Sequence, residues 1–393
     1  MFLPTPPFSD PANPSDAFHH VARQLLLHTE LRVAGLPCRL QEIEFYWFAT
    51  QHPDPFCHRH PLQRLHGRWY FHRVDSAYRG GSFKGLDLTF SDGQGYGGIL
   101  LRGLLLPDGS VVSGPSRLVD FLLEATGFSN VAQLDAHLQH HPAVSPETDP
   151  SHHPIAPPDT SSRQPSEPIP GFGQPLPCVV PRHHSRPRSR RPPQTQWTQL
   201  PVPQHPVGSP DPPLVLRAAA TPLPYSIYAT ARVGLPLHSR RLERTTLHFF
   251  CQPYRFLTLP HTLAAGRPQL ILALHQRGLS PQDIRSLTRS PLATIESYLQ
   301  AYHAGYHTPD PAATLHTLLE HPASSALQLC RLYGLLARLL SAGSPALHQT
   351  LTSQTATCTP ASSMGSQHEA SSASQGSHSY PKDDRASDDA TLS

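Results

Sequence analysis

A proline-rich segment divides this sequence and limits what each part of it can fold into. Residues 142–213 hold 21 of the 46 prolines in the chain of 393 residues. Proline has a fixed φ and no backbone N–H, and this segment also has few aliphatic side chains to bury. Because so little apolar surface cannot offset the entropy of an ordered chain, we expect a disordered linker over 142–213, partly in the polyproline II conformation.

The linker separates two candidate domains, and a tail follows the second. Residues 16–141 combine apolar runs with Gly-rich turns. They predict an α+β domain with a mixed or antiparallel sheet and flanking helices. Residues 214–343 carry a helical pattern and predict an all-α domain. Residues 344–393 are rich in Ser and Thr and have no apolar periodicity, so we expect a disordered tail.

The overall charge indicates no particular partner, because 31 basic residues are balanced by 28 acidic ones. A cluster of linker arginines is either a nucleic-acid or localisation signal or only a solvated charged stretch. It consists of Arg182, Arg186, Arg188, Arg190 and Arg191. The sequence shows neither a signal peptide nor an apolar run of about 18 residues. Six scattered cysteines fit reduced thiols. We therefore expect a soluble protein of the cytoplasm, nucleoid-associated if bacterial, with no membrane partner.

The first candidate domain has readable helix and strand signals. Apolar residues at Val21 and Leu25 predict a short helix that leads into a strand. Further strands are predicted over 38–48, 67–73, 86–90 and 97–106. Asp108-Gly109 predicts a hairpin turn. Gly114-Pro115-Ser116 opens a predicted helix that Gly127 ends.

Three charged residues in these predicted strands are candidates for chemistry. Glu42 and Glu44 lie two positions apart, so their side chains share one face of a strand. Aromatic neighbours could raise the pKa of such a carboxylate and make it a general base. The alternative is that both glutamates face solvent at a sheet edge. Arg102 lies in an otherwise apolar strand, where a guanidinium needs a carboxylate or phosphate partner.

Five motifs in one order carry a resemblance over residues 17–125. They are the helix ARQLLLHTEL, the strand Glu42-Ile43-Glu44-Phe45-Tyr46, the turn Asp54-Pro55-Phe56-Cys57-His58, the strand Ile99-Leu100-Leu101-Arg102, and the helix start Gly114-Pro115-Ser116-Arg117-Leu118. In this order they resemble the 3-methyladenine (alkylpurine) DNA glycosylases. The resemblance implies that Glu44 and Arg102 hold the water that attacks the glycosidic carbon.

The resemblance also implies a pocket for a damaged purine flipped out of the duplex. Tyr46 and His58 would be its stacking walls, and His72 stands where the family has a tyrosine. Asp87 replaces the asparagine that screens purine substituents, unless the alignment slips and Thr89 takes that position. The turn at residues 78–82 offers nothing bulky at the position of the family's intercalating aromatic residue. The connection between the strand of Arg102 and the next helix is shorter than in the family.

The histidines near this predicted pocket have a second interpretation. A metal site could use Cys57, His58, His60, His66 and His72, because thiolate and imidazole are good metal ligands. With 27 histidines in the chain, however, such clustering arises readily by chance. We therefore expect no metal and no cofactor.

The second candidate domain contains a helix-turn-helix pattern. One predicted helix ends at Gly278. Ser280 and Asp283 are the signature of a capped short helix, and Pro291 precedes a longer helix. Residues 232–306 resemble the helix-turn-helix segments of bacterial regulators and transposases. The resemblance implies phosphate contacts and base-edge contacts with DNA. The predicted phosphate-binding residues are Arg267, Arg285 and Arg289, and the predicted base-reading residues are Thr294, Ser297 and Gln300. The alternative is a helix pair that only packs, and a helix over 325–340 is expected to be core or a self-association face.

These predictions combine into one function and one alternative. The sequence predicts a DNA repair enzyme that hydrolyses the N-glycosidic bond of alkylated or deaminated purines and carries a helix-turn-helix domain. The alternative is a transcriptional regulator or transposase-related protein whose glycosylase-like domain is inactive. Double-stranded DNA is the expected partner in both cases, and the oligomeric state stays open.

Overall fold

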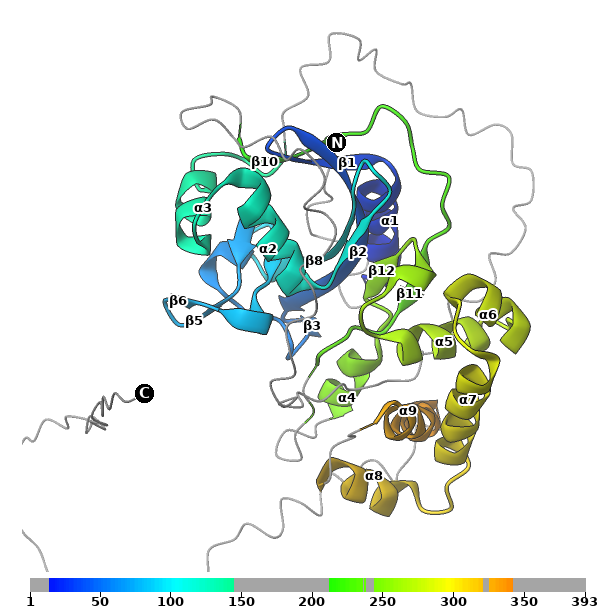
Figure 1. The fold of residues 1–393 in the computed structure, drawn as a ribbon. Coiled ribbons are helices and arrows are strands. Elements are labelled where there is room, and N and C mark those ends of the chain that lie inside the picture. The colour runs from blue at the N-terminus through cyan, green and yellow to red at the C-terminus, as the bar shows by residue number, and fades with distance from the viewer. Residues whose placement is uncertain (1–13, 145–211, 236, 238–243, 321–324, 342–393) are drawn as a thin grey trace, which may run out of the picture.

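The computed structural model describes residues 14–144, 212–235, 237, 244–320 and 325–341. It is an α+β structure in which a curled antiparallel sheet lies above a group of helices (Figure 1). The helices are α1 (Ser15–Leu27), α2 (Pro115–Thr126), α3 (Val131–Leu138), α4 (Arg244–Cys251), α5 (Arg267–Gln276), α6 (Pro281–Thr288), α7 (Leu292–Tyr306), α8 (Pro311–Glu320) and α9 (Ala326–Ser341). The strands are β1 (Thr29–Val33), β2 (Leu36–Ala49), β3 (His52–Pro53), β4 (His66–Phe71), β5 (Arg73–Val74), β6 (Ala77–Tyr78), β7 (Leu86–Phe90), β8 (Tyr96–Leu105), β9 (Val111–Ser113), β10 (Leu214–Ala218), β11 (Tyr228–Thr230) and β12 (Arg255–Leu257).

The main sheet runs in the order β10-β1-β2-β8-β7-β4, and its strands pair antiparallel. The chain after α3 links the two ends of this order. The N–H of Ala143 donates to the carbonyl of Gly67 at 3.0 Å, and its carbonyl accepts from Leu216 at 2.8 Å. The edges of β4 and β10 are therefore covered, which protects them from pairing with another chain.

The segment predicted to be all helical begins with strands, which corrects that part of the predicted fold class. β10 pairs with β1, and β12 pairs with β2 beside Glu42 and Glu44. β11 in turn pairs with β12. These strands have three to five residues, which is too short for a periodic pattern, and they gain their partners only when the chain folds. The two segments assigned to separate domains therefore share one sheet.

The two faces of the sheet differ in chemistry. Ile43, Phe45 and Trp47 of β2 point into an apolar core, where Phe18 of α1 stacks on Phe45 with ring centroids 4.5 Å apart. The alternate residues point to the other face. On β2 these are Glu42, Glu44 and Tyr46, which pair with Gly103, Leu100 and Gly98 of β8, with a register shift on either side of Glu42. We call this second side the polar face.

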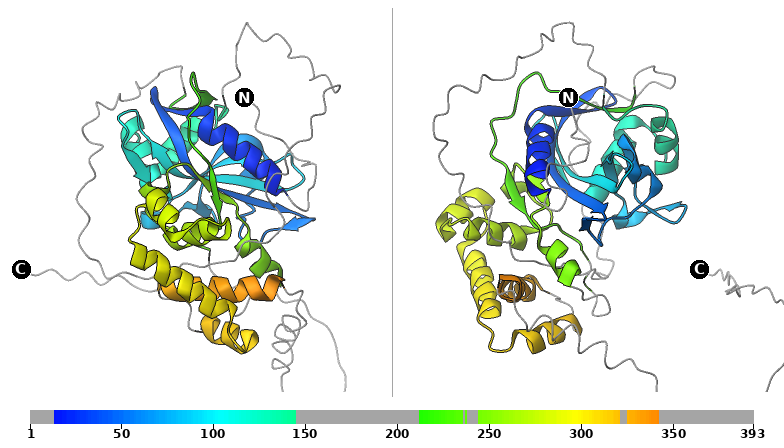
Figure 2. Two further views of the ribbon diagram at one scale, coloured as in Figure 1. Left: turned by 90° about the vertical axis from the view of Figure 1, so that its right-hand side faces the viewer. Right: turned by 180° about the vertical axis from the view of Figure 1, so that it is seen from behind.

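The helices α5 to α9 lie below the sheet in Figure 1 and on one side of it in both views of Figure 2. Their apolar side chains form a second core, against which Tyr46 and Phe56 pack from the sheet side. α9 contributes a buried face to this core, so its predicted role as core is confirmed. Part of the polar face is therefore covered by the C-terminal half of the chain.

Most predicted elements of the first half are confirmed. The helix over α1, the strands β2, β4, β7 and β8, the Asp108-Gly109 hairpin and the capped helix α2 all occur as expected. In the second half, α5, α6, α7 and α9 are confirmed, and α6 has the predicted reciprocal cap between Ser280 and Asp283. The helices α3, α4 and α8 were not predicted.

Some sequence predictions fall outside the described residues. They include most of the linker with its arginine cluster and all of the tail. Within the described part of the chain, no helix is long and apolar enough to cross a membrane. Cys38, Cys57 and Cys330 are free and buried. Cys251 is disulfide-bonded, so the expectation of reduced thiols throughout was wrong at this position.

Candidate functional site

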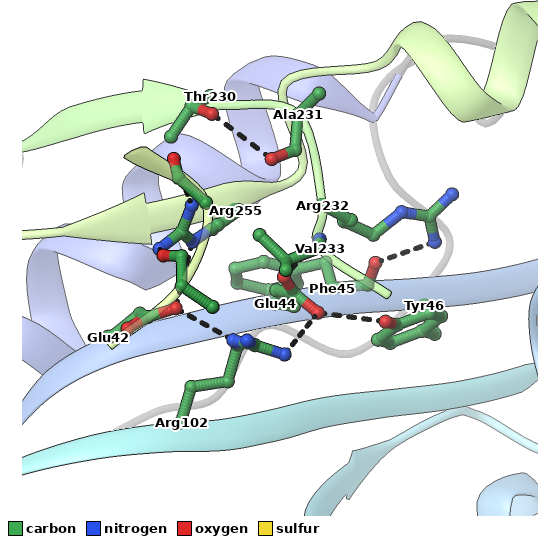
Figure 3. Close-up of polar contacts among 12 residues, drawn as sticks. Glu42, Glu44, Phe45, Tyr46, Arg102, Thr230, Ala231, Arg232, Val233 and Arg255 are labelled. Atoms are coloured by element: carbon green, nitrogen blue, oxygen red, sulfur yellow. Dashed lines mark hydrogen bonds and ion pairs between the residues drawn. The ribbon is translucent and has the colours of Figure 1, made fainter. Parts of the chain in front are cut away.

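The predicted catalytic pair Glu44 and Arg102 lies together on the polar face. The guanidinium of Arg102 donates from one terminal nitrogen to Glu44 Oε2 at 3.3 Å and from Nε to Glu42 Oε1 at 2.7 Å. Figure 3 shows the three side chains converging between β2 and β8. The requirement of Arg102 for a carboxylate partner is therefore met twice. The alternative that the glutamates face solvent was wrong, because Glu44 is 0% exposed and Glu42 is 2% exposed.

Residues from the C-terminal half complete the environment of both glutamates. The backbone N–H of Val233 donates to Glu44 Oε1 at 2.7 Å, and the Tyr46 hydroxyl donates to Glu44 Oε2 at 2.8 Å. Arg255 of β12 donates from Nε to Glu42 Oε1 at 2.8 Å. The segment 231–235, which carries Val233, crosses directly over Glu44 in Figure 3. We call this segment the strap.

A second buried ion pair anchors the strap. Arg232 donates to both carboxylate oxygens of Asp54, at 2.6 and 3.2 Å, and to the carbonyls of Phe45 and Phe249. Its guanidinium also lies over the ring of Tyr46, 4.6 Å from the centroid. Arg232 and Asp54 are both 0% exposed. A bidentate pair of this kind fixes geometry as well as charge.

The charges of this network balance. It contains the carboxylates Glu42, Glu44 and Asp54 and the guanidinium groups of Arg102, Arg232 and Arg255. Burial alone would raise the pKa of Glu42, but the positive charges of Arg255 and Arg102 outweigh it and lower that pKa. The expectation of a raised pKa was therefore wrong for Glu42. Burial opposes the charge of Arg102, yet Glu44 and Glu42 raise the pKa of its guanidinium above the ordinary value.

The predicted pocket residues His58, His72 and Asp87 form a second group on the polar face. His72 Nε2 contacts Asp87 Oδ1 at 2.7 Å, and Gln63 Nε2 donates to Asp87 Oδ2 at 3.1 Å. The rings of His58 and His72 lie 4.4 Å apart at 70°. We call His58, His60, Tyr70, His72 and Asp87 the imidazole-aromatic cluster.

Stacking in this cluster comes from β4 and the turn after β3. His60 stacks on Tyr70 with centroids 4.7 Å apart and an interplanar angle of 19°. Tyr70 faces Asp87 directly across the β4–β7 pair. Burial and the neighbouring His72 lower the pKa of His58, so its imidazole is neutral near pH 7. Planar rings around a buried carboxylate suit a planar hydrogen-bonding ligand.

Two predicted details of the pocket differ from the structure. Tyr46, expected as a stacking wall beside His58, instead has Arg232 over its ring and donates to Glu44. No ring contact joins Tyr46 to His58 among the residues that the structure describes. Thr89, the alternative to Asp87, accepts the backbone N–H of Arg68. Asp87 is 1% exposed and lies between His72 and Gln63, which contact its two carboxylate oxygens.

The histidines and the cysteine weighed as metal ligands do not form a recognisable site in the described residues. No group of three or more His, Cys, Asp or Glu side chains in the described parts of the chain has a geometry that could hold a metal ion. Cys57 is buried, and its Sγ lies 3.5 Å from the carbonyl of Tyr96. Burial raises the pKa of this thiol to about 12, so it carries a proton at neutral pH.

The predicted DNA-binding residues lie on α5, α6, α7 and the turn between α6 and α7. Arg285 and Arg289 line an open hollow of about 550 Å³, together with Ser286, Ser290 and Pro291. Arg289 has a φ of 54°, the left-handed conformation that ends α6 and turns the chain toward α7. Both arginine side chains are exposed.

The other predicted DNA contacts differ in accessibility. Ser297 and Gln300 are exposed on α7, whereas Thr294 is half-buried. Arg267 donates to the carbonyl of Thr288 at 3.4 Å and to Ser290 Oγ at 3.3 Å. Its guanidinium therefore braces the turn between the helices, and a phosphate would have to compete with these bonds.

Sequence reasoning missed Arg232 and Arg255 as parts of the site. Both lie in short apolar contexts, Ala231-Arg232-Val233 and Arg255-Phe256-Leu257. The same signal, an arginine among apolar residues, identified Arg102 and could have identified these two. Their carboxylate partners are 178 and 213 positions away in the sequence, and no local pattern indicates a pairing over such a separation.

Comparisons with known proteins give one relative. An uncharacterized protein, L759, of Acanthamoeba polyphaga mimivirus is 34% identical over 134 residues. The match covers 30% of this chain and 62% of the viral protein, so the chain spans less than two thirds of that relative. No protein-family model matches the chain, and no solved structure matches it.

Proposed function

We propose that this protein hydrolyses the N-glycosidic bond of alkylated or deaminated purines in double-stranded DNA. The supporting observation is the contact between Glu44 and Arg102 on the polar face, with Tyr46 bonded to the same carboxylate. A carboxylate can take a proton from water while the base leaves an oxocarbenium-like sugar. The guanidinium orients that carboxylate through the hydrogen bond to Oε2.

The strap controls access to Glu44. Val233, Tyr46 and Arg102 already donate to this carboxylate, which has no solvent exposure. A water molecule and a sugar can reach Glu44 only if the strap shifts and releases the bond from Val233. Binding of the extruded nucleotide is therefore coupled to movement of residues 231–235.

The imidazole-aromatic cluster is the proposed site for the extruded base. It lies on the same face as Glu44, on the second and third strands beyond β2, since the order is β2-β8-β7-β4. Its stacked rings can hold a purine by dispersion, and Asp87 can accept hydrogen bonds from the purine edge. The hydrogen bonds that Asp87 accepts from His72 and Gln63 fix the direction of its carboxylate.

The helix-turn-helix of α6 and α7 is the proposed duplex-binding element. Arg285 and Arg289 offer two exposed guanidinium groups at the turn, and Ser297 and Gln300 offer polar side chains on α7. Arginine at such a turn contacts phosphates, and short polar side chains contact base edges. Binding through this element would hold the polar face at high effective concentration near the duplex.

Base release by Glu44→Gln tests the proposed activity. Full-length protein is mixed in excess with a duplex that contains one hypoxanthine or 3-methyladenine, and abasic sites are revealed as alkali-sensitive breaks. We expect the wild type to release the base and E44Q to be slower by about 100-fold or more, because the general base is lost. Exposed Glu124 on α2 is the control, and E124Q should match the wild type.

Two results would contradict the proposed activity. One is the absence of base release by the wild type at micromolar protein. The other is full activity of E44Q with an unchanged melting temperature.

A DNA-binding protein with an inactive sheet is the second candidate function. The observation that favours it is the complete hydrogen bonding of Glu44 in a buried, charge-balanced network. Such a network can serve structure alone. Salt-dependent duplex binding without base release from either lesion would support this candidate over the first.

A further inference from the structure

Arg79 lies directly beside the imidazole-aromatic cluster. Its backbone N–H donates to the carbonyl of His72 at 2.9 Å, which continues the β5–β6 ladder beyond the pair of Arg73 and Tyr78. Opposite residues of an antiparallel pair project from the same face. Arg79 therefore shares the face of His72, and its charge helps lower the pKa of His58.

The guanidinium of Arg79 has no acidic partner in the described parts of the chain. Its neighbours are already engaged, since Arg73 pairs with Asp135 and Lys84 pairs with Asp120. Asp87, the nearest carboxylate of the cluster, already contacts His72 and Gln63. The Nε of Arg79 is shielded from water and lacks a hydrogen-bond partner among the described residues.

A shielded donor without a partner is costly unless a ligand supplies an acceptor. The cluster can stack a planar base. Of the nearby cations Arg73, Lys84 and Arg79, the first two have acidic partners and Arg79 has none among the described residues. A nucleotide brings both a planar base and an adjacent phosphate, and a guanidinium matches phosphate geometry. The position of Arg79 thus fits the anionic part of a ligand whose base occupies the cluster.

We propose that Arg79 binds a backbone phosphate next to the nucleotide whose base enters the imidazole-aromatic cluster. This inference rests on the proposed function and names a further substrate-binding residue for it. Arg79 would favour the extruded state, because its phosphate contact forms together with entry of the base. It would contribute little to a duplex whose bases stay stacked.

The test measures binding without depending on hydrolysis. Full-length protein is titrated into two fluorescent duplexes, one undamaged and one with 2′-fluoro-2′-deoxyinosine, whose fluorine opposes the oxocarbenium-like state. Anisotropy is recorded at several salt concentrations. We expect Arg79→Gln to weaken binding to the fluoroinosine duplex roughly 10-fold and to reduce its salt slope by about 1. Binding to the undamaged duplex should be nearly unchanged.

Two further variants separate a phosphate contact from a structural role. Arg79→Lys keeps the charge and should keep the salt slope. Arg23→Gln removes an exposed arginine from α1, which covers the other face of the sheet, and should leave both affinities as in the wild type. Melting temperatures of all variants show whether each one folds.

The inference is overturned if R79Q retains the wild-type slope and affinity on the fluoroinosine duplex. It is also overturned if R79Q weakens both duplexes equally, or if R79K loses the slope while folded. Failure of the proposed activity gives a different result. In that case a cleavable hypoxanthine duplex shows no base release, although the fluoroinosine duplex is still bound with the salt slope that depends on Arg79.

Discussion

At the scale of single residues, the polar face is built from charged side chains that are buried and paired with one another. Arg232 and Arg255 are 0% exposed, and each has a carboxylate oxygen within 2.8 Å. Removing a charge from water costs several kcal/mol, about as much as a close partner returns. Such pairs therefore define geometry more than they add stability, and loss of one partner leaves the other charge buried.

His52 provides a pH-dependent test at this scale. It is 1% exposed and bridges the carbonyl of Trp47 at 2.8 Å and the hydroxyl of Tyr254 at 2.9 Å. Burial lowers its pKa from 6.5 to about 4. Between these pH values the unfolded chain binds a proton that the folded chain does not, so stability should fall as pH falls, by at most about 1.4 kcal/mol per pH unit.

Urea unfolding at pH 7, 6 and 5 measures this contribution. The substitution His52→Gln removes this titrating group. The slope of the unfolding free energy against pH should therefore be smaller than in the wild type, by the equivalent of up to one bound proton. Exposed His140 is the control, and H140Q should leave the pH dependence unchanged. Identical pH profiles for H52Q and the wild type would show that the pKa of His52 is the same in the folded and the unfolded chain, which would contradict this prediction.

At the scale of elements, local signals predicted helices better than short strands. The cap of α6 is formed by Ser280 and Asp283, three residues apart, so sequence alone indicates it. The glycine that follows α2 likewise ends that helix with a φ of 76°. β11 and β12 have three residues each and exist because β12 finds β2. Their pairing joins residues far apart in the chain, so no local sequence pattern predicts it.

The contact between α7 and α9 gives a testable consequence of close packing. A side chain at Gly334 would meet the backbone carbonyl of Tyr302, and one at Gly305 would meet the backbone of Arg331. Gly334→Ala should therefore destabilise the protein by about 1–3 kcal/mol, despite the better helix propensity of alanine. Chemical denaturation measures the difference.

A matched substitution on the exposed side of α7 checks the cause. Gln300 is exposed on α7, so Gln300→Ala changes mainly helix propensity and should be close to neutral in stability. A G334A variant as stable as the wild type would mean that α7 and α9 can separate without loss.

At the scale of the whole molecule, the sheet is completed by two distant parts of the chain. β10 covers the edge of β1, and β12 with the strap covers Glu42 and Glu44. The intervening residues 145–211 close a long loop, but closure entropy grows slowly, by about 0.6 kcal/mol for each doubling of length. A long insertion between two parts of one sheet is therefore tolerated.

Truncation tests this arrangement. A chain that ends at residue 144 lacks Arg232 and Arg255 and leaves Asp54 and Glu42 short of their partners. We expect it to lose cooperative thermal unfolding, because uncompensated buried charges and an open sheet edge are both destabilising. Circular dichroism during heating measures the transition.

Replacement of residues 145–211 by about ten Gly and Ser residues is the matched control. This chain keeps β10 to β12 and should unfold cooperatively near the full-length melting temperature. Cooperative unfolding of the 1–144 chain at that same temperature would mean that the first half folds without the second.

The sequence alone determined the positions of most helices and long strands, since caps, turns and apolar periodicity are local. It also determined that Arg102 needs a carboxylate or phosphate partner, because a guanidinium in an apolar strand cannot stay unpaired. Only the tertiary structure decided which carboxylates it meets, that Arg232 and Arg255 join them, and that the strap covers Glu44. Those contacts connect residues up to 213 positions apart, and their energy appears only when the folded chain excludes water from the polar face.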